Sequence, residues 1–137
     1  MIFFVRRLVK TLERFGFFKI YRVLYEGVGV SNNDFYAGAQ GRNGWKVRAG
    51  IKAKYSKIFG FLLKTSKIPK LNEFGVLVFY NSKHDVDNVS ASAKLLIDSM
   101  KGVVCKDDNS KYFKGMFIVH DPNLKKNTFE FLILKIK

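Results

Sequence analysis

The feature that most constrains the fold is an apolar run near the middle of the chain, Phe-Gly-Val-Leu-Val-Phe-Tyr at residues 74–80. A short run that is rich in β-branched and aromatic residues favours a β-strand. Because the run has no polar residue at alternate positions, we expect both of its faces to be covered, as in the centre of a sheet. The chain therefore has to place further elements beside this strand and on both sides of it.

Other segments supply those elements. Residues 2–15 have the spacing of an amphipathic helix, which we expect to dock on the domain; extending a dimer interface and lying on a membrane surface are its other uses. We also predict a strand at 17–27, a glycine-rich loop at 27–44, helices at 45–65 and 87–101, and strands at 112–119 and 128–136 that are joined as a hairpin. This order predicts an α+β fold with a small mixed β-sheet, two main helices (β-α-β-α-β-β) and an extra N-terminal helix, in a single domain over residues 1–137.

The charge of the chain is strongly positive and unevenly distributed. It carries 25 lysine and arginine residues against 11 acidic ones, a formal net charge of +14. Such a charge is typical of a nucleic-acid-binding protein, although an anionic membrane or a ribonucleoprotein would also attract it. No acid occurs at residues 35–72, and the helix there carries exposed lysines that we expect to contact phosphates, Lys46, Lys54, Lys57 and Lys64. The preceding loop, with Asn32 and Asn33, would either close on DNA or be a plain surface connection.

The scarce acidic residues gather in one stretch. Residues 84–112 contain five of the 11 acids: Asp85, Asp87, Asp98, Asp107 and Asp108. Clustered carboxylate oxygens hold hard divalent cations. Taken singly, Asp87 is better interpreted as a helix N-cap and Asp98 as a solvated surface charge. The whole set favours a metal-dependent site that acts on a polyanion.

The helix predicted at 87–101 has two distinct faces. The face to be buried consists of Val89, Ala93, Leu96 and Met100. A second face, which would present charge to solvent, consists of Asp87, Ala91, Lys94 and Asp98. We therefore expect Lys94 to stand beside the acidic residues.

The acidic stretch resembles a known family. The pattern Asp85-x-Asp87-Asn88, Lys94, Asp98, Gly102 and Asp107-Asp108 looks like the signature of the RusA family of Holliday junction resolvases. Residues 31–36, Ser-Asn-Asn-Asp-Phe-Tyr, resemble the N-terminal Ser-x-Asn-x-x-Tyr segment of that family. The resemblance covers roughly residues 20–136. Val30 stands where the family usually has proline, and residues 1–19 form an extension that we cannot match.

The resemblance implies an activity and a set of site residues. RusA-family proteins are small, dimeric, Mg²⁺-dependent endonucleases of phages and prophages that cut four-way DNA junctions by paired symmetric nicks in recombination and repair. The resemblance makes Asp85, Asp87 and Asp108 the catalytic metal ligands, with Asp107 as a weaker candidate and Mn²⁺ as a substitute ion. Lys94 would face phosphate charge or orient a carboxylate.

Two alternatives remain beside the nuclease. A non-catalytic nucleic-acid-binding protein would use the basic faces but gives no reason for clustered aspartates, which repel phosphate when no metal is bound. A degenerate resolvase would bind branched DNA without cutting it.

The setting follows from a few further features. A single cysteine, Cys105, fits a reducing cytosol, so we expect a cytoplasmic protein of a bacterial or phage-infected cell with no membrane partner. Because resolution needs two nicks related by a twofold axis, we also expect a homodimer.

Overall fold

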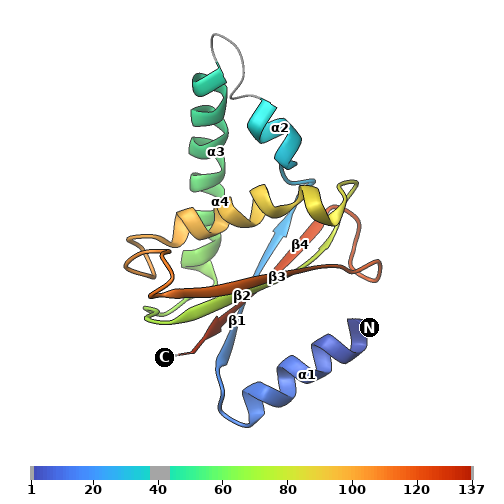
Figure 1. Ribbon diagram of the computed structural model, residues 1–137, viewed down its shortest axis with the longest axis vertical. Coiled ribbons are helices and arrows are strands. Elements are labelled where there is room, and N and C mark those ends of the chain that lie inside the picture. Colours follow the sequence, from blue (N-terminus) through green and yellow to red (C-terminus); the bar gives the residue numbers. More distant parts are fainter. Residues whose placement is uncertain (1, 38–43, 137) are drawn as a thin grey trace.

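The computed structural model describes residues 2–37 and 44–136, and it has the predicted α+β architecture (Figure 1). Its elements are, in chain order, α1 (Ile2–Arg14), β1 (Lys19–Glu26), α2 (Asn32–Ala37), α3 (Gly44–Thr65), β2 (Phe74–Asn81), a 3₁₀ turn η1 (Val86–Asn88), α4 (Ser90–Met100), β3 (Phe113–His120) and β4 (Thr128–Lys135). The N-terminal helix, the two main helices and the strands all lie close to their predicted positions. None of the helices in the described ranges is long and apolar enough to cross a membrane.

The strands form one mixed sheet in the order β1-β4-β2-β3. β4 runs antiparallel to both β1 and β2, whereas β3 runs parallel to β2, to which α4 connects it. β2 is therefore an interior strand, as predicted. The predicted hairpin is wrong, because β3 and β4 lie on opposite sides of β2. β4 buries side chains on both of its faces and so is stabilised by an interior position, whereas the middle of β3 is exposed.

Helices α2, α3 and α4 cover one face of the sheet, and α1 lies against the other (Figure 1). The main core lies between the sheet and the three helices. Among the side chains that α3 and the strands contribute to it, none more than 1% exposed, are Phe59, Leu63, Val78, Phe129 and Phe131. The predicted apolar stripe of α4 is confirmed, since exposure is 0–1% for Val89, Ala93, Leu96 and Met100.

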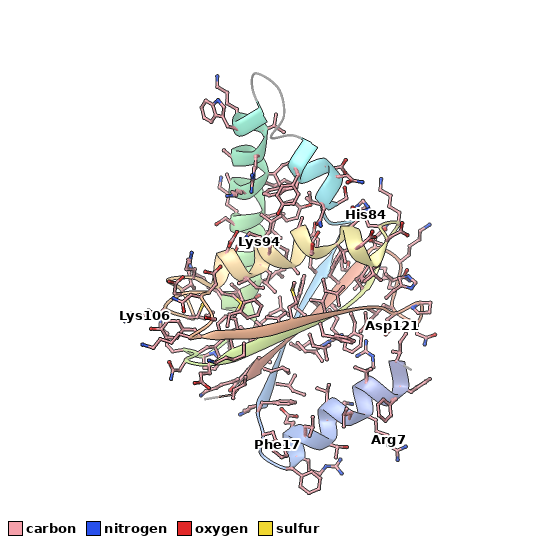
Figure 2. All side chains as sticks on the ribbon, viewed as in Figure 1. Arg7, Phe17, His84, Lys94, Lys106 and Asp121 are labelled. Atoms are coloured by element: carbon pink, nitrogen blue, oxygen red, sulfur yellow. The ribbon has the colours of Figure 1, made fainter. Side chains whose placement is uncertain are left out.

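α1 packs on the opposite face through a smaller apolar cluster and one arginine. Val9 belongs to the cluster that surrounds Phe79. The guanidinium group of Arg6 lies 3.9 Å from the centre of the Phe79 ring and forms ion pairs with Asp121 (2.8 Å) and Glu130 (2.7 Å). Both acidic residues are buried, and Figure 2 shows Asp121 near the start of α1. The expectation that this helix docks on the domain is confirmed.

The segment at 27–44 is not the continuous loop that its glycines predict. Residues 32–37 form α2, which is shorter than two turns. Ser31 caps this helix, because its Oγ accepts the backbone N–H of Asp34 at 3.0 Å, and Phe35 anchors it with 2% exposure. Residues 38–43 of the predicted loop lie outside the described residues.

Candidate functional site

The start of α4 differs from the helix N-terminus that the sequence predicts. The turn η1 comes first, α4 begins at Ser90, and Val89 occupies the cap position without a side-chain hydrogen bond. Asp87 is therefore not the N-cap of this helix, and it does not belong to the helical face that carries Lys94. Asp87 was predicted either to cap the helix or to share a helical face with Lys94. Because Asp87 lies in the 3₁₀ turn, it does not follow the α-helical spacing that these predictions assumed.

Asn32 caps α4 from a distant part of the chain. Its Oδ1 accepts the backbone N–H of Ala91 at 2.7 Å and the hydroxyl of Ser90 at 3.1 Å, while its Nδ2 donates to the carbonyl of Asp87 at 3.2 Å. These bonds satisfy an N–H at the helix start and fix the segment that carries Asp87. Ala91 is buried, so its predicted place on the charged face is also wrong. The amide of Asn32, proposed to contact nucleic acid, is thus used within the protein, whereas Asn33 is exposed.

Asp85 and Asp87 form the first acidic pair, directly after β2. Both side chains are exposed, and neither forms an ion pair with any residue that the structure describes. Both lie near the hydroxyl group of Tyr80, which donates a hydrogen bond to the carbonyl of His84 at 3.0 Å. Burial raises the pKa of Tyr80, and the charges of the two carboxylates raise that pKa further. The structure therefore brings these two predicted ligands together without a counter-ion.

Asp107 and Asp108 form the second acidic pair, beyond the C-terminal end of α4. The Nζ of Lys101 lies 3.5 Å from Asp107 Oδ1 and 3.3 Å from Asp108 Oδ1. The backbone N–H of Asp108 also donates to Asp107 Oδ1 at 2.8 Å. This hydrogen bond lowers the pKa of Asp107, and the side chain of Asp108 and then the charge of Lys101 lower that pKa further. The second pair already has a cation.

A groove along α4 connects the surroundings of the two pairs. It encloses about 290 Å³ and is lined by Tyr36, Ser90, Lys94, Ile97, Asp108, Phe113 and Met116. Ser90, one turn after Asp87, lies at the helix start, and Asp108 belongs to the second pair. Lys94 is exposed between them and forms no ion pair within the described part of the chain (Figure 2). Lys94 and Asp108 therefore line the same groove.

The structure does not bring the two acidic pairs into contact. With 11 residues, α4 spans about 16 Å, and the pairs lie beyond its opposite ends. Among residues 2–37 and 44–136, no three histidine, cysteine, aspartate or glutamate side chains gather closely enough to hold a metal ion. That Asp85, Asp87 and Asp108 act as one ligand set stays a prediction.

The first pair alone nevertheless offers donors that suit a hard cation. Proteins commonly hold Mg²⁺ with one or two carboxylates, while water and substrate phosphates fill its remaining positions. Asp85 and Asp87 supply two exposed carboxylates, and none of the described lysine or arginine side chains forms an ion pair with them. Carboxylate oxygens also suit Mn²⁺. Asp108 would become available as a further ligand once it separates from Lys101.

The predicted basic face lies on α3, which extends away from the sheet (Figure 1). All of its proposed phosphate contacts have exposed side chains, Lys46, Lys54, Lys57 and Lys64. Trp45, at the start of the helix, is 68% exposed, and the Nζ of Lys46 lies 5.5 Å from the centre of its ring. Aromatic and cationic side chains therefore occur together at this end of α3.

Several residues of the site were not among those expected. Tyr36 lines the groove, and the sequence could have identified it because it ends the Ser-Asn-Asn-Asp-Phe-Tyr motif. No sequence feature marked Phe113 and Met116, because their position depends on the pairing of β3 with β2. Lys101, the last residue of the helix predicted at 87–101, forms ion pairs with two carboxylates.

Comparison with known proteins identified no relative of this chain. No protein-family model matches the chain, and no curated protein matches it. The candidate site therefore depends on its own residues and on their arrangement.

Proposed function

We propose that this chain is a Mg²⁺-dependent endonuclease of the RusA type that cuts four-way DNA junctions. The observation that carries the proposal is the first acidic pair, Asp85 and Asp87. In a chain with a net charge of +14, these two neighbouring carboxylates are exposed and form no ion pair with any side chain at residues 2–37 or 44–136. Asn32 fixes the backbone of Asp87 at that place. A carboxylate pair held in this way contributes little to the stability of the fold and is well suited to bind a metal ion.

Each part of the site would have a separate task in phosphodiester hydrolysis. When bound, Mg²⁺ would neutralise phosphate charge and lower the pKa of a water molecule. Asp85 and Asp87 would hold the ion, with Asp108 as a further ligand and Asp107 as a weaker candidate. The exposed ammonium group of Lys94 would attract the scissile phosphate into the groove and stabilise the negative charge that develops there.

Binding of the DNA would depend mainly on the basic surface. The exposed lysines of α3 are placed to contact the phosphate backbone, which is the chief source of affinity for duplex DNA. A four-way junction has twofold symmetry, so paired nicks require two copies of one site and favour a homodimer. Such a substrate would place the enzyme in the cytoplasm of a bacterial or phage-infected cell.

The decisive experiment measures cleavage of an end-labelled four-way junction. Wild-type protein should cut with Mg²⁺ or Mn²⁺ and should not cut when the metal is chelated. The Asp85→Asn/Asp87→Asn variant should bind the junction at least as tightly but leave it intact, because two negative charges that repel phosphate have been removed. Glu26→Gln, which alters an exposed acid at the end of β1, is the matched control and should cut normally. Cleavage by the double variant at the wild-type rate would assign the reaction to another site.

A second candidate is a protein that binds branched DNA without cutting it. The specific observation in its favour is that Lys101 forms ion pairs with both carboxylates of the second pair, so that these two acids are not available to a metal ion. This function predicts tight, metal-independent junction binding and intact DNA with either Mg²⁺ or Mn²⁺. The cleavage experiment therefore separates the two candidates.

A further inference from the structure

Residues 2–19 present an unusual set of side chains to solvent. Arg6 holds α1 against the sheet through its ion pairs with Asp121 and Glu130. Apart from Gly16, every exposed residue at positions 2–19 is either large and apolar or cationic. We refer to these residues as the N-terminal surface: Phe3, Phe4, Leu8, Phe15, Phe17, Arg7, Lys10, Arg14 and Lys19.

The apolar and the cationic side chains follow separate lines along α1. Leu8 lies one turn after Phe4, whereas Lys10 and Arg14 continue the line that begins at Arg7. Figure 2 shows Arg7 on the side of α1 that faces away from the sheet. The helix therefore presents a line of positive charge beside a line of apolar groups.

Neither kind of side chain is compensated within the described part of the chain. The four phenylalanines of the N-terminal surface are 63–83% exposed, and so many in one short segment mark an interaction surface. Its four cations form no ion pair with any residue at 2–37 or 44–136. Glu13 is the one acid at positions 2–19, and its carboxylate accepts the backbone N–H of Ile20 at 2.6 Å.

An apolar groove adjoins this surface. It encloses about 470 Å³, and all of the residues that line it are apolar or glycine. Leu8 belongs both to the groove and to the N-terminal surface, and Phe117 of β3, which is 56% exposed, also lines the groove. Such a lining suits a hydrocarbon group better than a polar one.

We propose that the N-terminal surface binds an anionic lipid bilayer, with its phenylalanines and Leu8 among the acyl chains and its cations against the headgroups. Helices that lie in a membrane interface combine lysine and arginine with phenylalanine and leucine in this way. Charge complementarity selects the partner. Anionic headgroups attract the four cations, whereas a second copy of a chain with a net charge of +14 is repelled.

The groove and the position of α1 favour lipid over nucleic acid. Phosphates would also pair with the cations, and unpaired bases stack on phenylalanine. Neither fills a groove with an apolar lining, whereas acyl chains do. In addition, α1 lies on one face of the sheet, and α3 with its exposed lysines lies on the other (Figure 1). The proposed DNA surface and the N-terminal surface are therefore separate.

Binding of this kind changes the expected setting of the protein. It is reversible and needs no spanning helix, and it would replace the expectation of a protein without a membrane partner. One consequence rests on the proposed nuclease function. DNA bound at α3 and a membrane bound at α1 would lie on opposite sides of the sheet, so one molecule could hold both. The membrane binding itself does not depend on that function.

Co-sedimentation with lipid vesicles tests the inference in the absence of DNA. Wild-type protein should bind vesicles made from equal parts of phosphatidylglycerol and phosphatidylcholine, and less of it should bind as the salt concentration rises. It should bind vesicles of phosphatidylcholine alone at least about 10-fold more weakly. Equal affinity for the two kinds of vesicle would overturn the inference. So would no binding to the anionic vesicles, which would leave the surface to a protein partner.

Two triple variants separate the N-terminal surface from the net charge of the chain. The first removes three of its cations, Arg7→Gln/Lys10→Gln/Arg14→Gln. The matched control removes the same charge from α3, Lys54→Gln/Lys57→Gln/Lys64→Gln. The first variant should lose at least about 10-fold in affinity for the anionic vesicles, and the control should bind nearly as well as the wild type. Equal losses would show that net charge alone drives the binding and would overturn the inference.

A pair of double variants tests the apolar contact. Phe3→Ser/Phe4→Ser should lose at least about 10-fold in vesicle affinity, because two aromatic rings no longer leave water. The matched control on α3 is Trp45→Ser/Phe61→Ser, whose side chains are 68% and 66% exposed, and it should bind the vesicles normally. All four side chains are largely exposed, so circular dichroism should show both variants folded. Unchanged binding by Phe3→Ser/Phe4→Ser would overturn the proposed insertion.

Duplex DNA serves as the competing partner. If the variant that lacks Arg7, Lys10 and Arg14 lost affinity for duplex DNA while its vesicle binding stayed normal, the N-terminal surface would be assigned to nucleic acid instead. Failure of the nuclease proposal has a different signature, namely intact four-way junctions together with normal binding of anionic vesicles.

Discussion

Asp85 and Asp87 before α4, and Asp107 and Asp108 beyond its end, have the same chemistry and contrasting surroundings. The first pair is exposed, has no ion-pair partner in the part of the chain that the structure describes and lies near the hydroxyl of a buried tyrosine. The second pair accepts a backbone N–H and binds Lys101 through both carboxylates. A carboxylate that serves the fold has its hydrogen bonds and its charge satisfied within the protein. The first pair has been held in place without that compensation, which makes it available to a cation from solution.

The largest expected effect separates the two pairs by activity. Asp87→Asn should reduce metal-dependent junction cleavage by more than about 100-fold, because even the loss of a group behind a metal ligand costs about 10–100-fold. Asp107→Asn should reduce cleavage far less, since its carboxylate is already bound by Lys101. Single-turnover rates at saturating Mg²⁺ measure both variants. Equal losses would show that the two pairs form one site.

Removal of the Asn32 side chain, which fixes the segment that carries Asp87, should have a large effect on stability. Asn32→Ala removes the hydrogen bonds to Ala91, Ser90 and Asp87, and it should lower the free energy of unfolding by about 1–3 kcal/mol. Asn33→Ala is the matched control and should change that free energy by less than about 0.5 kcal/mol, as exposed positions usually do. Urea denaturation measures both. If the two variants were equally stable, the contacts of Asn32 would not hold the α4 start.

The sequence predicted most of the fold because most elements have a local signal. The apolar run at 74–80 identified an interior strand, and the stripe from Val89 to Met100 identified the buried face of α4. α2 was missed because it is too short to show a period; it depends on the cap from Ser31 and on burial of Phe35. The order of strands has no local signal, so the last two were wrongly joined as a hairpin.

The site was harder to predict than the fold. Composition and spacing found all four acids that flank α4, but not that they form two separate pairs. The 3₁₀ turn around Asp87 interrupts the helical spacing, and its stabilising partner, Asn32, acts across 55 positions. Contacts at that separation leave no pattern in a single sequence. Asp121 and Glu130, which bind Arg6, were overlooked for the same reason.

A smaller effect concerns the second pair and pH. Because the pKa of Asp107 is lowered on folding, its contribution to stability is present above the unfolded pKa of about 3.9 and is lost as pH falls through the folded value. Lys101→Met removes one cause of the lower pKa. The free energy of unfolding should therefore fall less steeply in this variant as the pH drops below about 4. Lys114→Met, which removes a lysine bound to a carbonyl, is the control. Urea midpoints from pH 6 to pH 3, an interval that brackets the pKa of about 3.9, measure the difference. The same acid dependence in both variants would exclude Lys101 as a structural partner.

The smallest effect uses Cys105 as a reporter of the second pair. Burial raises the pKa of this thiol to about 11, and the charges of Asp108 and Asp107 contribute to the rise. Asp108→Asn removes the nearer charge, so the thiol should ionise at a lower pH than in the wild type. Asp87→Asn should leave its ionisation unchanged, because the first pair lies at the opposite end of α4. The carbon-13 shift of the Cys105 Cβ, followed by nuclear magnetic resonance against pH, measures this. If Asp87→Asn lowered the thiol pKa as much as Asp108→Asn did, the electrostatic separation of the two pairs would be disproved.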